Sequence, residues 1–207
     1  MRGNWFEGWR LFVVLMLALS ALCFWLADIS GLDVDGVRMV IRFTAKTSLL
    51  FFCLAFSAAA LWRLWPNAWT HWQRRNRRYL GVTFAGSHGI HAIAVAAFAA
   101  MDPAGFLAAT SATTYIFGGI GYAIIIAMTA TSFSRAARAI GPRAWRILHL
   151  GGGYFLWAQF MVSFGKRVPG MPLYALFLVP LLAVMALRLI AMASPRSARR
   201  ADLTEAA

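Results

Sequence analysis

Charged residues are scarce in this chain of 207 residues: they make up 13% of it, against 61% hydrophobic residues. Soluble domains carry about a quarter charged residues, so the composition excludes a soluble enzyme of ordinary type. Six membrane spans of about 20 residues would leave only short loops and two tails. Because a dinucleotide-binding half alone takes about 100 residues, the chain has no room for a soluble catalytic domain.

Cysteine is also rare, and acidic residues number only seven against 20 Lys and Arg. The two cysteines, Cys23 and Cys53, both fall inside apolar runs. They are therefore expected to be small buried hydrophobes and not a disulfide pair.

Six long apolar runs fill most of the chain. Lipid offers no hydrogen-bonding partners to the backbone, so helices are the only open-ended form that can span it. The sequence predicts an all-α membrane protein: a six-transmembrane-helix bundle forming one domain over 1–207, with a mobile polar tail over 194–207. The expected spans cover about 11–27, 43–64, 79–101, 114–133, 145–164 and 171–192.

Basic residues lie unevenly between these runs. Fifteen arginines fall on the side of the N-terminus and five lysines and arginines on the other side. By the positive-inside rule both termini are expected in the cytoplasm. The basic residues behind the net charge of +13 are then expected to interact with anionic lipid headgroups. A membrane partner is therefore expected and a nucleic-acid partner is not.

Three of the four histidines fall in expected spans, His88 and His91 in the third and His149 at the start of the fifth. Ionisable residues are costly in a membrane and mark functional sites. Neutral imidazoles on facing helices suit haem iron, and His88 and His91 share one helix face. The same residues would also serve as hydrogen bonds between helices, so both interpretations stay open.

Two motifs, in this order, resemble those of ferric reductase-like transmembrane domains. The first is Arg77-Arg78-Tyr79-Leu80-Gly81, with His91 ten residues after the glycine. The second runs from Thr131 through Trp145 to His149. The likeness covers about residues 43–165 and is greatest to the haem-binding membrane subunit of bacterial methionine sulfoxide reductase systems.

The resemblance implies a six-helix bundle of the bacterial inner membrane that passes electrons through b-type haem. It implies His91 and His149 as the metal ligands, and one haem b or none. Electrons would come from a quinol or a separate flavin reductase and go to an unidentified acceptor, so the chain is at most the membrane subunit of an oxidoreductase.

One residue of the family pattern is missing. The family carries a second histidine about thirteen residues after His149, where this chain has the stretch 160–163 without one. Counted from Arg78 and Arg146 at ~1.5 Å per residue, His91 lies ~20 Å deep, His88 ~15 Å and His149 ~4.5 Å. His91 and His149 could then share one haem only with a stagger of about three turns or a lower start of the third helix.

Met161 lies at ~22 Å by the same count and is level with His91. Its thioether is a known class of axial ligand, although methionine in such helices is mostly core filler. His88 is the further candidate, as a ligand or as a donor to a haem propionate. Two other functions stay open: a haem-free structural or assembly subunit of the same fold, and, more weakly, a small-solute transporter.

Overall fold

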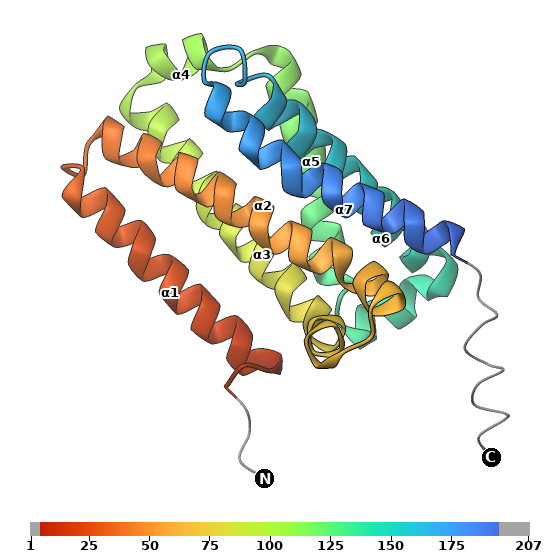
Figure 1. Ribbon diagram of the computed structural model, residues 1–207. Coiled ribbons are helices and arrows are strands. Elements are labelled where there is room, and N and C mark those ends of the chain that lie inside the picture. The colour runs from red at the N-terminus through yellow and green to blue at the C-terminus, as the bar shows by residue number, and fades with distance from the viewer. Residues whose placement is uncertain (1–4, 195–207) are drawn as a thin grey trace, which may run out of the picture.

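The computed structural model describes residues 5–194, and this part of the chain is helical without strands. The tail expected over 194–207 lies outside the described residues, Ser194 excepted. The elements, seen in Figure 1, are α1 (Gly8–Ile29), α2 (Val34–Leu64), α3 (Ala68–Met101), α4 (Pro103–Ala109), α5 (Ala112–Ala130), α6 (Ser134–Gly165), the short 3-10 turn η1 (Pro172–Tyr174) and α7 (Ala175–Ala193).

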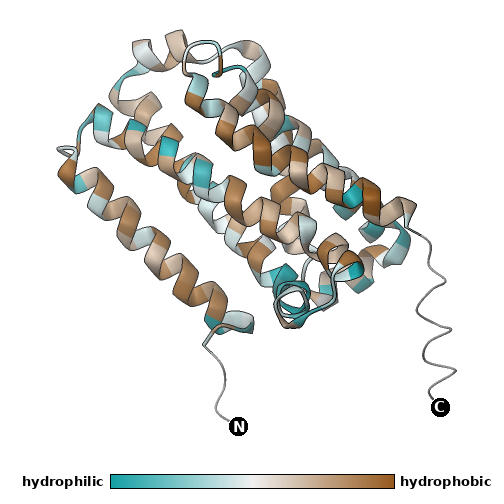
Figure 2. Cartoon of the chain, viewed as in Figure 1, coloured by the Kyte–Doolittle hydropathy of each residue, from teal (hydrophilic) through white to brown (hydrophobic). Residues whose placement is uncertain are grey.

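Five helices in the described part are long and apolar enough to cross a membrane: α1, α2, α3, α5 and the η1–α7 unit. This confirms an all-α membrane protein. α6 is not among the five, because His149, Gln159 and three consecutive glycines lower the hydropathy of an otherwise apolar run. In Figure 2 most of the ribbon of α1 and of α7 has the colours of hydrophobic residues.

Two helices begin well before the apolar runs that mark them. α2 starts at Val34, where the Asp33 carboxylate accepts two backbone N–H groups at 3.0 Å. α3 starts at Ala68, where Asn67 and Thr70 form a capping box. These caps satisfy the free amides of the first turn, so polar sequence stays helical outside the apolar core. The hydropathy pattern therefore predicts where a helix is apolar and not where it begins.

α6 is broken near its start. Gly141 has a φ of 77° and a ψ of 163°, and Pro142 follows it. Glycine adopts a positive φ without strain, and proline cannot continue the hydrogen bonds of the preceding turn. The rest of α6, which includes His149, is thus a separate straight segment.

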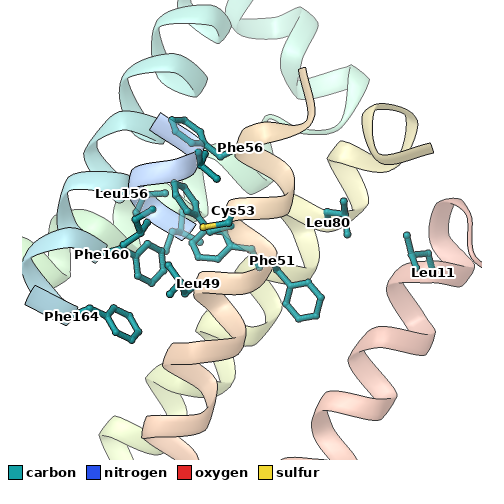
Figure 3. Packing of buried hydrophobic residues seen from close by; sticks show 14 residues of the cluster. Leu11, Leu49, Phe51, Cys53, Phe56, Leu80, Leu156, Phe160 and Phe164 are labelled. Carbon is teal, nitrogen blue, oxygen red and sulfur yellow. The ribbon is translucent and has the colours of Figure 1, made fainter. Parts of the chain in front are cut away.

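The core lies where α2, α3, α6 and α7 meet (Figure 3). Phe56 of α2 packs there with Leu156 and Phe160 of α6 and Leu181 of α7. α1 packs against α2 and α3 and exposes most of its apolar side chains, as a lipid-facing helix does. Cys23 and Cys53 are buried and unpaired, as expected.

Five segments lie at one end of the bundle. Trp9, near the start of α1, contacts Tyr79 of α3 and stacks on Phe133, which precedes α6, with ring centroids 5.5 and 5.7 Å apart. At the same end Arg63 of α2 donates to the backbone oxygen of Ser194 after α7 (Figure 1). We call this the arginine-rich end, because residues 74–78 and the first turns of α6 carry eight of the chain's eighteen arginines.

Candidate functional site

His91 lies on the face of α3 that packs against α2. Its Nδ1 is 3.1 Å from the Ile41 carbonyl oxygen and 3.1 Å from the Thr44 hydroxyl. The Thr44 hydroxyl donates its proton to the Val40 carbonyl at 2.7 Å, so Nδ1 of His91 is the donor in both contacts. The neutral ring then keeps its lone pair on Nε2. Metal-ligating histidines are oriented in this way, with the other ring nitrogen donating to a backbone carbonyl.

A cluster of buried hydroxyls holds α2 and α3 together beside His91. The Ser87 hydroxyl lies 2.9 Å from those of Thr47 and Ser48. Thr44, Ser48 and Ser87 have no exposed surface. Small polar residues let membrane helices approach closely and hydrogen-bond across the contact. The cluster therefore fixes the position of His91 against α2.

His88 lies one turn before His91 and stacks on it, with ring centroids 5.2 Å apart and planes inclined by 17°. It also contacts Tyr122 of α5 at 5.0 Å. Its Nδ1 is buried, and no described residue offers it a hydrogen bond. Two nearly parallel rings on one face of a helix cannot approach an iron from opposite sides. At most one of the two histidines can therefore be an axial ligand of a given haem.

His149 contacts a hydroxyl through its other ring nitrogen. Its Nε2 lies 3.0 Å from the Thr131 hydroxyl, which also lies 2.7 Å from the Ala127 carbonyl. Either group can be the donor, because no carbonyl holds Nε2 as the Ile41 carbonyl holds Nδ1 of His91. One face of the ring is covered by Trp145, at 4.3 Å between centroids.

A cavity of about 1000 Å³ opens at the arginine-rich end, between α1, α2, α3, α5 and α6. His149 belongs to its wall, whereas His88, His91 and Met161 do not line it. Beside Gly81 the space is empty, since an added Cβ would meet no atom within 4 Å. Aromatic rings form much of the interior and guanidinium groups surround the mouth: Phe52, Phe56, Phe84 and Trp145 inside, and Arg74, Arg75, Arg77 and Arg78 outside.

The register of α3 and α6 separates His91 from His149. Phe160 lies level with Phe84 and His88, at 6.1 and 6.2 Å between ring centroids. Both helices run away from the arginine-rich end, so His91 lies ~21 to ~27 Å further along the bundle than His149 at ~1.5 Å per residue. The stagger that would bring these two histidines level is absent. His91 and His149 as ligands of one iron stay an expectation of the resemblance, which this register does not favour.

Met161 follows Phe160 directly and packs against the main core cluster, partly buried. By the same two ring contacts it lies within ~3 to ~9 Å of the level of His91. It stays the better candidate for a second axial ligand on α6.

Two features that a haem site needs occur at two separate places in this bundle. The orientation of a ligating imidazole occurs at His91, and an open cavity with a basic mouth occurs at His149. Within residues 5–194, no three His, Cys, Asp or Glu side chains gather as a metal site would require. A single imidazole with a thioether partner is a haem donor set, so the chemistry of His91 with Met161 fits haem.

The glycines of α3 and α6 have different uses. An added Cβ at Gly86 would lie 2.6 Å from Met16, and one at Gly152 would lie 2.7 Å from Met128. These two glycines permit close packing of helices. Only Gly81 combines open space with a place in the cavity wall.

Sequence reasoning missed two residues that shape these sites. Thr44 belongs to a series of hydroxyl residues three to four positions apart in an apolar run, a spacing that indicates a polar helix contact. Arg188 lies within the last apolar run, where a charge indicates function, although it was counted only as a cytoplasmic charge. Its guanidinium donates to the Phe56 carbonyl at 2.9 Å and lies 4.0 Å from the ring of that residue.

No protein-family model, characterised protein or solved structure matches the chain. The likeness to ferric reductase-like transmembrane domains therefore depends on the two sequence motifs alone.

Proposed function

We propose that the chain is the membrane subunit of an electron-transfer system of the ferric reductase-like type, holding one b-type haem within the bacterial inner membrane. The observation that supports this most is the pair of hydrogen bonds at His91. The Ile41 carbonyl and the Thr44 hydroxyl hold Nδ1 as the donor and leave Nε2 as a ligand. This orientation is costly to keep in a membrane unless the free nitrogen has a use.

The roles of the chain's own residues follow from that geometry. Nε2 of His91 and the Met161 thioether would hold the haem, and the acceptors at Nδ1 would fix the His91 ring and raise its basicity. When bound, haem supplies one-electron chemistry that the side chains lack. The proposed donor is a quinol or a separate flavin reductase, because the described residues form a helical membrane bundle and supply no strands for a nucleotide fold.

The proposal includes six membrane spans with both ends of the chain in the cytoplasm. The straight part of α6, residues 143–165, is about 34 Å long and so exceeds the hydrocarbon core of ~30 Å. It lies between α5 and α7 in the bundle (Figure 1). The arginine-rich end then faces the cytoplasm by the fifteen-to-five distribution of basic residues.

An absorption spectrum of the purified chain, expressed with haem supplied, tests the proposal. We expect a Soret band that shifts on reduction with dithionite and about one haem per chain. Met161→Leu should then lose haem or give a high-spin spectrum, whereas Met171→Leu, at an exposed methionine before η1, should change nothing. A folded chain that stays colourless would refute the proposal.

The second candidate is a haem-free structural or assembly subunit of the same fold. One observation favours it: the contacts of His91 with α2 and its stacking on His88 also account for both residues as helix contacts. The absence of a second histidine in α6 agrees with it. The same spectrum separates the two candidates.

A further inference from the structure

Positive charge at the cavity mouth exceeds the negative charge that the described residues supply. Arg74, Arg75, Arg77 and Arg78 line the mouth. Within residues 5–194 one ion pair is formed, between Arg75 and Glu7. Arg78 donates to a tyrosine hydroxyl at 2.9 Å and Arg74 stacks on a tryptophan, and these neutral partners do not offset a charge.

A further arginine, Arg188, lies behind the cavity wall. The Arg188 guanidinium lies over Phe56, which lines the cavity, and its Nε is buried without an acceptor among the described residues. A buried guanidinium N–H without a partner is costly, and negative charge in the neighbouring cavity would offset part of that cost.

The remainder of the cavity excludes a purely ionic ligand. Phe52, Phe84, Ile125 and Leu156 give the interior an apolar surface, and the volume of about 1000 Å³ far exceeds that of a phosphate ion. The ligand therefore needs an anionic head at the mouth and an apolar body inside. His149 lines this cavity, and its Nε2 lies 3.0 Å from the Thr131 hydroxyl.

We propose that this cavity binds an anionic phospholipid, with its phosphate at Arg77 and Arg78 and the first part of an acyl chain beside Gly81. Basic pockets between membrane helices recognise anionic headgroups in this way. The inference does not depend on the proposed function, because His91 lies outside the cavity and haem content reports on it separately.

Binding to the whole purified chain in a neutral detergent provides the test. Short-chain phosphatidylglycerol, phosphatidylcholine of the same chain length and inorganic phosphate are titrated, with thermal stabilisation and native mass spectrometry as readouts. We expect phosphatidylglycerol to bind about tenfold more tightly than phosphatidylcholine, and phosphate alone to leave the melting temperature unchanged.

Two pairs of variants locate the site. Arg77→Gln with Arg78→Gln should weaken phosphatidylglycerol binding by about fivefold for each arginine. Arg138→Gln with Arg143→Gln, exposed at the same end but outside the cavity, should leave it unchanged.

Gly81→Leu changes no charge and tests the cavity itself. The added side chain enters the empty space beside position 81 and should block the acyl chain, while Gly89→Leu, which also meets no neighbour but does not line the cavity, should not.

Four results would overturn the proposal. Equal affinity for the two lipids would mean that the cavity does not recognise the headgroup charge. Equal losses of phosphatidylglycerol affinity in both pairs of arginine variants would mean that the lipid binds through general surface charge. Full stabilisation by inorganic phosphate would make the site an anion site without a lipid. Loss of haem in Arg77→Gln with Arg78→Gln, without any change in lipid binding, would place haem in the cavity and leave the electron-transfer function standing.

Discussion

Replacing Thr44 with valine isolates the hydrogen bond that orients His91. The Thr44 hydroxyl is fully buried and lies 3.1 Å from Nδ1 of His91. Valine has nearly the same shape and lacks the hydroxyl, while the Ile41 carbonyl remains as the second acceptor at 3.1 Å. The variant therefore removes one of the two acceptors of the ring and keeps the fold.

The expected effect follows from the strength of such bonds in membranes. Hydrogen bonds between membrane helices average about 0.6 kcal/mol, with a maximum near 1.7 kcal/mol. One average bond corresponds to about a threefold loss of haem affinity. The same acceptor makes the imidazole more basic and favours the ferric state, so its loss should raise the midpoint potential by about 25 mV.

Haem titration and a redox titration of the purified chain measure both quantities. Thr47→Val is the matched control, because that hydroxyl lies on the same helix and contacts Ser87 instead of His91. We expect Thr47→Val to keep the wild-type affinity and potential. If both variants shifted the potential equally, the effect would come from α2–α3 packing, and the assigned role of Thr44 would be refuted.

The remaining predictions concern packing, topology and partners. Ser87→Leu should lower the stability by about 3 kcal/mol, because the serine is fully buried between α2 and α3, and an unchanged melting temperature in detergent would contradict that packing. Reporter fusions after Met101 and Arg167 should report the non-cytoplasmic side, and fusions after Arg78 and Arg143 the cytoplasm; the opposite pattern would invert the topology. The purified single chain should not oxidise NADH or NADPH, and turnover by it would refute the need for a separate donor.

The helical membrane fold could be predicted because a long apolar run can satisfy its backbone hydrogen bonds in lipid only as a helix. The starts of α2 and α3 could not, since Asp33 and Asn67 cap polar turns that carry no hydropathy signal. The break in α6 is indicated in the sequence only by Gly141 and Pro142 together.

Single histidines of interest could be identified, but not their relation to one another. A depth count from arginine markers assumes that α3 and α6 start at the same level. The contact of Phe84 with Phe160 sets the true register, and such a contact between helices leaves no trace in a single sequence. The ring orientations of His91 and His149 depend likewise on Thr44 and Thr131, which reach them only in the folded chain.

The haem content of three histidine variants tests the central claim most directly. His91→Ala, His88→Ala and His149→Ala are purified in parallel and their haem is quantified per folded chain. We predict that His91→Ala loses its haem, that His88→Ala binds it only more weakly, and that His149→Ala retains it. Nδ1 of His91 donates to a backbone carbonyl and leaves Nε2 free, and His149 lies far from that level of the bundle. Wild-type haem content in His91→Ala would contradict the account.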